Sequence, residues 1–98
     1  MAKYDISHRA LEDLYRIWEC TVETWSEDQA DKYYRELIAG INDIVSAPLS
    51  KGQPFFEILP NLRGYHIRKH VIFYTIQQDG RILVVRILHE RMDYSIHF

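Results

Sequence analysis

The stretch that decides the fold is Arg63–Asp93, with the sequence RGYHIRKHVIFYTIQQDGRILVVRILHERMD. It carries most of the chain's apolar strand-forming residues, in three runs at 62–68, 71–76 and 81–88. Asp79-Gly80 separates the last two runs and predicts a hairpin turn of type I′. We therefore expect an antiparallel β-meander in which Arg81–Leu88, the most apolar run, forms a central strand.

The alternation along this last run gives the expected sheet two faces. One face is expected to carry Leu83, Val85, Ile87 and His89, and the other Ile82, Val84, Arg86 and Leu88. Burying an unpaired guanidinium costs roughly several kcal/mol. We therefore expect helices to cover the first face and the Arg86 face to stay open.

The N-terminal half predicts a helical hairpin. Apolar residues recur at spacings of three and four across His8–Trp25, and Ser7 can cap the start of this helix. Ser26 restarts the pattern, with Gln29 completing a capping box. Pro48 ends the second helix because its ring and missing amide cannot continue it. So short a turn makes the two helices antiparallel neighbours.

Two further segments complete the expected domain. Lys3–Ile6 is a short extended segment before the first helix, and Leu49–Asn61 is an apolar loop that should pack along the core as a collar. We expect one α+β domain spanning residues 1–98, with the N-terminal helical hairpin packed on a twisted, mainly antiparallel β-sheet. The expected order of elements is β-α-α-β-β-β.

Charge and composition restrict the classes of function. Residues 1–60 hold six Lys/Arg against eleven Asp/Glu, whereas residues 61–98 hold six against three, with four of the five histidines. This asymmetry indicates either a basic face for an acidic protein segment or nucleic acid, or chance segregation of solvated charges. No apolar run approaches the roughly 20 residues of a membrane span, and no signal peptide is evident. With Cys20 as the single cysteine, we expect a cytoplasmic protein without an internal disulfide.

Cofactor chemistry has little support in the sequence. The four glycines are scattered singly, so there is no phosphate-binding loop, and no serine lies in a nucleophile elbow. Imidazoles at His66, His70 and His89 suit a transition metal, but no carboxylate or cysteine lies at supporting spacing. We expect neither a cofactor nor a metal.

The cationic residues of the meander offer two alternatives. RNA cleavage through a 2′-hydroxyl needs a base, an acid and cations around the phosphorane. Arg63 and Arg86 could supply charge, and His89 or Tyr94 the proton transfers. The alternative is that these side chains bind an acidic partner or protect exposed strand edges.

Several segments resemble the ParE branch of the RelE/ParE toxin superfamily. They are YDISHRALEDLYRIWECT from Tyr4, WSEDQADKYY from Trp25, APLSKGQPF from Ala47, and HVIFYTI followed by RILHERMD in the meander. The resemblance implies a toxin of a type II toxin–antitoxin system that inhibits DNA gyrase by binding and is neutralised by a ParD-like antitoxin. RelE-type relatives instead cut messenger RNA on the ribosome, and Arg63, Arg86 and His89 would then be catalytic. Lys69 is the only lysine of the meander, which favours binding.

The resemblance also implies a partner surface. We expect the antitoxin's C-terminal segment to wrap the hairpin and to reach a basic sheet face, giving a hetero-oligomer. The toxin alone should not bind nucleic acid sequence-specifically. Tyrosine and tryptophan at helical spacing are also typical of plain core. The expected contact residues are Trp18, Tyr33, Leu37, Arg63, Arg68, Lys69, Arg86, His89 and Arg91.

Overall fold

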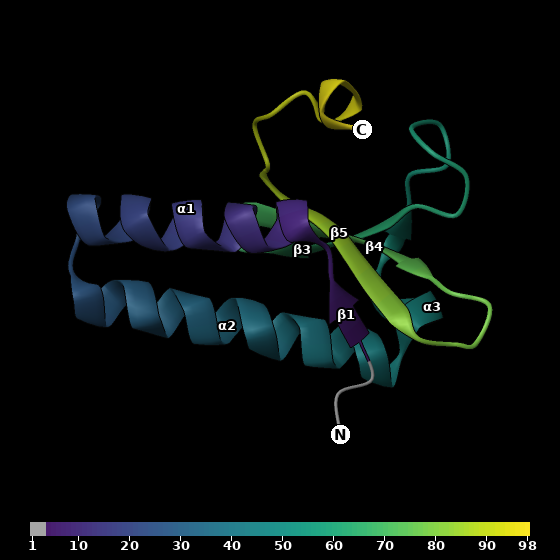
Figure 1. Cartoon of the computed structure of the whole chain (residues 1–98), viewed down its shortest axis with the longest axis horizontal. Coiled ribbons are helices and arrows are strands. Elements are labelled where there is room, and N and C mark those ends of the chain that lie inside the picture. Colours follow the sequence, from purple (N-terminus) through teal and green to yellow (C-terminus); the bar gives the residue numbers. More distant parts are fainter. Residues whose placement is uncertain (1–3) are drawn as a thin grey trace.

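The computed structural model describes residues 4–98, which form a helical hairpin against a five-stranded sheet (Figure 1). The strand order is β1-β5-β4-β3-β2, with β1 parallel to β5 and the other neighbours antiparallel. The α+β class and the mainly antiparallel sheet are confirmed, whereas Lys3, the expected start of the first strand, lies outside the described residues. In chain order the elements are β1 (Tyr4–Ile6), α1 (His8–Thr24), α2 (Glu27–Ser46), α3 (Pro48–Lys51), β2 (Gln53–Pro54), β3 (Arg63–Ile67), β4 (His70–Ile76), β5 (Ile82–His89) and the 3₁₀ turn η1 (Tyr94–His97).

The sheet has one strand more than the sequence predicted. β2 is only two residues long and pairs Gln53 with Gly64 and Pro54 with Arg63 at the sheet's edge. A proline is tolerated there because an edge position does not need its missing amide. β4 is the middle strand, and β5 lies between β4 and β1.

Both helices begin at the predicted serine caps. The Ser7 hydroxyl accepts a hydrogen bond from the Ala10 amide at 3.1 Å, and the Ser26 hydroxyl accepts one from the Gln29 amide at 3.1 Å. α1 and α2 then run side by side in opposite directions against the sheet (Figure 1). Between residues 4 and 98, no helix is both long and apolar enough to cross a membrane.

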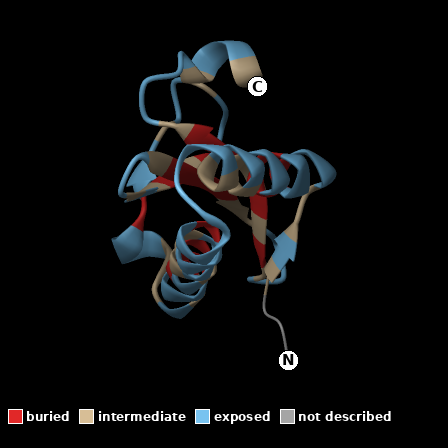
Figure 2. Cartoon of the chain, turned by 90° about the vertical axis from the view of Figure 1, so that its left-hand side faces the viewer, coloured by how far each residue is buried: buried red, intermediate tan, exposed pale blue. Residues whose placement is uncertain are grey.

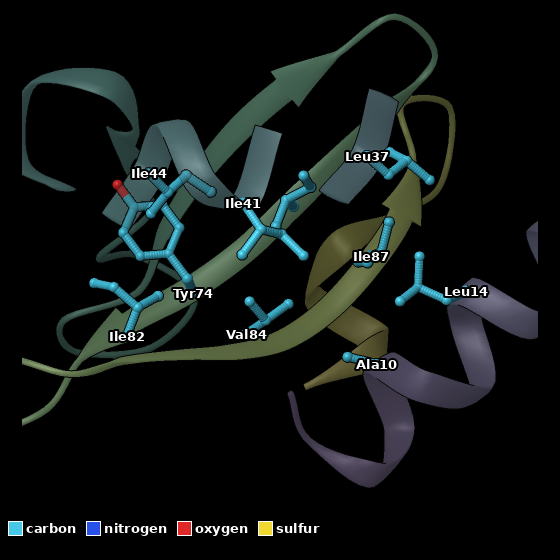
Figure 3. Close-up of a cluster of buried hydrophobic side chains, with 10 residues drawn as sticks. Ala10, Leu14, Leu37, Ile41, Ile44, Tyr74, Ile82, Val84 and Ile87 are labelled. Atoms are coloured by element: carbon cyan, nitrogen blue, oxygen red, sulfur yellow. The ribbon is translucent and has the colours of Figure 1, made fainter. Parts of the chain in front are cut away.

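The main core lies between the hairpin and the sheet (Figures 2 and 3). Leu37, Ile41 and Ile44 of α2 are all fully buried there. Gly40 allows α2 to approach closely, since a Cβ at this position would lie 3.0 Å from the Ile67 side chain. We call this side of the sheet the helix face. Its remaining buried residues are Ala10, Leu14, Ile72, Tyr74, Ile82, Val84 and Ile87.

The opposite side of the sheet is also covered. The predicted collar packs there, with Phe55 against Phe73 at a ring-centroid distance of 5.1 Å. Tyr94 and Phe98 of the C-terminal tail also contact Phe73, at 4.9 and 5.2 Å. We call this side the collar face. The expectation that one face stays open is therefore wrong, because the collar and the tail cover it.

A β-bulge in β5 changes which residues share a face. Phe73 pairs with Arg86 but Tyr74 pairs with Val84, so Val85 is an extra residue. Alternation therefore inverts at this point, and both Val84 and Ile87 pack on the helix face. The predicted faces are therefore right for Arg86, Ile87 and Leu88. They are wrong for the part of the strand before the bulge, because Ile82 and Val84 lie on the helix face and Val85 lies on the collar face.

The turn at Asp79-Gly80 also differs from the prediction. Gly80 has a φ of +87°, whereas Asp79 has a negative φ, so the turn is not of type I′. The Gly80 amide donates to the Gln77 carbonyl at 2.9 Å, and the Gln77 amide donates to the Arg81 carbonyl at 2.8 Å. These bonds describe a longer hairpin loop in which Gly80 alone needs the left-handed conformation.

Candidate functional site

Arg86 is held in an internal ion pair with Asp13 of α1. Its Nε and Nη2 donate to the two carboxylate oxygens at 2.8 and 3.0 Å, and its Nη1 donates to the His97 carbonyl at 3.1 Å. The two side chains are only 12% and 5% exposed. The hydrogen bond to Asp13 raises the pKa of Arg86 above its usual value. Arg86 is thus a paired structural cation rather than an exposed one.

Asp13 also closes the free edge of β5. One of its oxygens accepts the Ile87 amide at 3.0 Å, in the part of the strand that β1 does not reach. Ser7 binds the two carbonyls of β5 that precede this amide. Its amide donates to the Val84 carbonyl and its hydroxyl donates to the Val85 carbonyl, both at 2.9 Å. The start of α1 therefore takes the place of a neighbouring strand.

Arg63 is likewise committed to the fold. Its Nη2 donates to the Leu49 and Gly52 carbonyls at 3.0 and 3.1 Å, which ties β3 to the segment around α3. Arg63 pairs with Tyr74 and Arg86 pairs with Phe73, so the two arginines leave the sheet on opposite faces. The structure does not bring them together with His89 in one catalytic group.

The other predicted cations lie near the β3–β4 turn and the end of β5. Arg68 is exposed and pairs with Glu36 of α2 through two contacts of 2.8 Å. Lys69 and Arg91 are also exposed. These three residues are the accessible part of the predicted basic surface.

Of the three hairpin residues predicted to contact a partner, one lies inside the molecule. Leu37 is fully buried, because α2 turns this side toward the sheet, so its expected surface position is wrong. Trp18 is half-buried and its indole nitrogen donates to Asp31 at 3.0 Å. Tyr33 is half-buried and reaches the end of the sheet.

A groove runs along the second half of α1, where the helix passes the ends of β4 and β5. Two adjoining cavities of about 340 and 470 Å³ form it, and Cys20, Thr21, His70 and His89 line both. We call this the α1 groove. One end is lined by Arg16 together with the Asp13–Arg86 pair. Its other wall residues are Ile17, Ile87, Leu88, Met92 and His97 in the first cavity, and Thr24, Trp25, Gln29, Tyr33, Arg68 and Lys69 in the second.

The histidines of the groove are held by specific contacts. His70 Nδ1 lies 2.6 Å from the Tyr33 hydroxyl, and the His70 and His89 rings meet edge to face at a centroid distance of 5.3 Å. Burial lowers the pKa of His70 to about 4, and burial raises the pKa of Tyr33. Residues 4–98 contain no group of three or more His, Cys, Asp or Glu side chains placed to hold a metal ion.

Sequence reasoning missed two parts of this arrangement. Asp13 lies among the acidic residues on the polar side of α1, where a solvated position is usual, and nothing in the local sequence indicates its contact with Ile87 of β5. The Tyr33–His70 contact joins α2 to β4, and no local pattern in the sequence reports such a distant pair.

The family assignment follows from sequence matches along almost the whole chain. Residues 4–94 match the family described as "ParE toxin of type II toxin-antitoxin system, parDE". Toxin ParE1 of Mycobacterium tuberculosis is 39% identical over 92 residues, covering 94% of this chain and 93% of that protein. Toxin ParE1 of Caulobacter vibrioides is 35% identical over 97 residues, covering 99% and 98%.

The fold agrees with a solved structure described as a chromosomal ParDE TA system from P. aeruginosa. The TM-score is 0.78 at 17% identity, covering 91% of this chain and 96% of that one. The fold and the sequence matches define a toxin of the type II toxin–antitoxin class. The chain belongs to the ParE toxin family, and the resemblance seen in its sequence is confirmed.

Proposed function

We propose that this toxin inhibits DNA gyrase by binding it and that a ParD-like antitoxin neutralises the toxin in a tight complex. The observation that carries the proposal is the match of residues 4–94 to the ParE family. Toxin and antitoxin would meet gyrase in the cytoplasm, and binding would stabilise the complex of gyrase with cleaved DNA. The action needs no cofactor.

The geometry supports binding rather than catalysis. A ribonuclease mechanism would need Arg63, Arg86 and His89 around one phosphate. Arg63 and Arg86 leave opposite faces of the sheet, and each is already bonded to groups of the fold. Assembling a catalytic group would first require breaking the buried pair of Arg86 with Asp13.

The proposal is tested with purified toxin, gyrase and relaxed plasmid. We expect supercoiling to fall as toxin is added, linear DNA to accumulate after detergent and protease treatment, and a ParD-like antitoxin to reverse both effects. Toxin that has been denatured by heat is the control for nonspecific inhibition, and it should leave supercoiling unchanged. Full supercoiling at a large excess of folded toxin would overturn the proposal.

Primer extension on translated messages tests the ribonuclease alternative directly. Because the proposed action does not cut RNA, we expect toxin induction to leave message ends unchanged while DNA breaks appear. Cleavage within codons that disappears in an Arg86→Lys variant of unchanged stability would show the chemistry of the RelE relatives instead. That result would leave the fold and the family intact.

A further inference from the structure

The floor of the α1 groove is a pair of histidines on neighbouring strands. His70 of β4 and His89 of β5 stand directly opposite each other in the sheet and line both cavities. Their rings are nearly perpendicular, with an interplanar angle of 81°. The proposed function gives this pair no role, and neither histidine ion-pairs with a carboxylate within residues 4–98.

His70 is held as a neutral ring with its proton on Nε2. Its Nδ1 lies 2.6 Å from the Tyr33 hydroxyl, whereas that hydroxyl lies 3.5 Å from the Ile67 carbonyl. The hydroxyl has a single hydrogen, and its 3.5 Å contact with the Ile67 carbonyl is at the limit of a hydrogen bond. We therefore infer that the hydroxyl donates to Nδ1 and that Nε2 carries the hydrogen of the ring. Burial, which lowers the pKa of His70 to about 4, keeps the ring neutral at pH 7.

His89 is fixed in the same tautomer by the chain that follows it. Its Nδ1 accepts a hydrogen bond from the Arg91 amide at 3.1 Å, so its Nε2 also carries the hydrogen. Among residues 4–98 neither Nε2 has a hydrogen-bond partner, and neither is enclosed away from solvent. The groove therefore presents two adjacent N–H donors that are free to bind an acceptor.

The charges around the pair select the kind of acceptor. Arg16 and Arg86 line one end of the groove, and Arg68 and Lys69 line the other. Asp13 pairs with Arg86 at the first end and Glu36 pairs with Arg68 at the second, so Arg16 and Lys69 leave each end with a net positive charge. Two N–H donors between cations favour an anionic oxygen. They disfavour a metal ion, which needs the ring nitrogens without their protons.

We propose that His70 and His89 together anchor one Asp or Glu side chain of the antitoxin in the α1 groove, each donating its Nε2 hydrogen to that carboxylate. The inference rests on the proposed function, because it assumes an antitoxin partner. Tyr33 is a positioning residue, since its hydroxyl holds His70 in the donor tautomer.

The shape and composition of the groove fit an amphipathic segment with acidic residues. Ile17, Leu88 and Met92 supply apolar wall on which the partner's apolar side chains can pack. The cations at both ends attract negative charge and guide the approach of the segment. The paired histidines then distinguish a carboxylate from an amide of the same shape, because an amide carries no charge.

The first experiment compares toxin variants in titrations against the full-length cognate antitoxin. His89→Phe keeps a ring and removes the donor, and Tyr33→Phe keeps the ring that packs beside His70 and releases its Nδ1. We expect each to weaken binding about tenfold, since a hydrogen bond to a charged group contributes about that factor or more. The control His8→Phe changes a histidine at the exposed start of α1 and should bind as the wild type does.

A mutant cycle then identifies the partner residue. Each Asp and Glu of the antitoxin's toxin-binding segment is changed to Asn or Gln. One of these changes should weaken binding to wild-type toxin about tenfold and have almost no further effect on His89→Phe toxin. Strict additivity at every position would overturn the carboxylate anchor, while binding itself would still support the proposed function.

Nitrogen NMR of the wild-type imidazoles is independent of any substitution. Sodium acetate is the minimal probe, and we expect it to shift both Nε2 resonances, with saturation, while Nδ1 of both rings stays unprotonated. Unchanged Nε2 signals in both acetate and the antitoxin complex would overturn the inference. If the antitoxin fails to bind at all, the proposed partner is wrong, and the acetate titration still decides whether the paired donors bind a carboxylate.

Discussion

Replacing Asp13 with alanine should remove a buried side chain that accepts three hydrogen bonds. Its carboxylate accepts two hydrogen bonds from Arg86 and one from the Ile87 amide, and it is 5% exposed. The Asp13→Ala variant leaves a guanidinium that is 12% exposed without its counter-ion. It also leaves the Ile87 amide unpaired at the closed edge of β5.

The expected cost is large for a domain of this size. Breaking a buried pair by removing one partner costs about 3–5 kcal/mol, and the Ile87 amide adds about 1–3 kcal/mol. Arg86 keeps its bond to the His97 carbonyl, which offsets part of this sum. We therefore expect the free energy of unfolding to fall by about 3–5 kcal/mol. At about 4–8 °C per kcal/mol, Tm should fall by roughly 12–40 °C.

Urea and thermal denaturation followed by circular dichroism measure both quantities. The matched control is Glu36→Ala, which breaks a pair of the same two-contact geometry with Arg68, but on the surface. That control should cost at most about 1 kcal/mol, because solvent screens the exposed pair. The double variant Asp13→Leu, Arg86→Met should recover much of the loss, since it leaves no unpaired charge.

Equal losses for Asp13→Ala and Glu36→Ala would refute this reasoning. So would a double variant whose loss of stability equals the sum of the losses measured for Asp13→Leu and Arg86→Met as single variants. Either result would mean that the guanidinium finds water or another acceptor when Asp13 is absent.

Three further predictions concern other parts of the molecule. Because the folded pKa of His70, about 4, lies below the ordinary 6.5, stability should fall as pH drops from about 6.5 to 4. The loss should be about 1–2 kcal/mol after allowance for solvent screening, and urea titrations of wild-type and His70→Gln toxin would isolate it. Gly52→Ala should lower stability by about 1–3 kcal/mol, because its Cβ would lie 2.7 Å from Cε1 of the buried Tyr74 ring. A thermal melt measures this, with Gly80→Asn at the open, positive-φ turn as the tolerated control. Cys20 is exposed in the groove, so an antitoxin bound there should slow its reaction with a thiol reagent, and an unchanged rate in the complex would contradict that location.

The parts of the fold that local patterns govern could be predicted from the sequence. Ser7 and Ser26 cap their helices because a cap involves only three consecutive residues beyond it. The spacing of apolar residues located both helices. The collar could be expected because its apolar side chains must be buried, but no local pattern in the sequence indicates on which face of the sheet it packs.

The partners of the charged residues could not be predicted, because they depend on contacts between distant segments. Asp13 is 73 positions from Arg86, and its place on the polar side of α1 is typical of a solvated residue. Arg63 finds its acceptors in backbone carbonyls, which no side-chain pattern records. The two-residue β2 is too short for alternation to reveal.

The extra residue at Val85 separates the structural cation from the proposed recognition site. Without the bulge, strict alternation from Val84 would turn Arg86 toward the helix face and His89 toward the collar face. With it, Arg86 starts from the collar face and meets Asp13 and the C-terminal tail at the edge of β5. His89 instead lies beside His70 on the helix face, and both rings line the α1 groove. One inserted backbone position therefore commits the arginine to stability and leaves the histidine pair available to a partner.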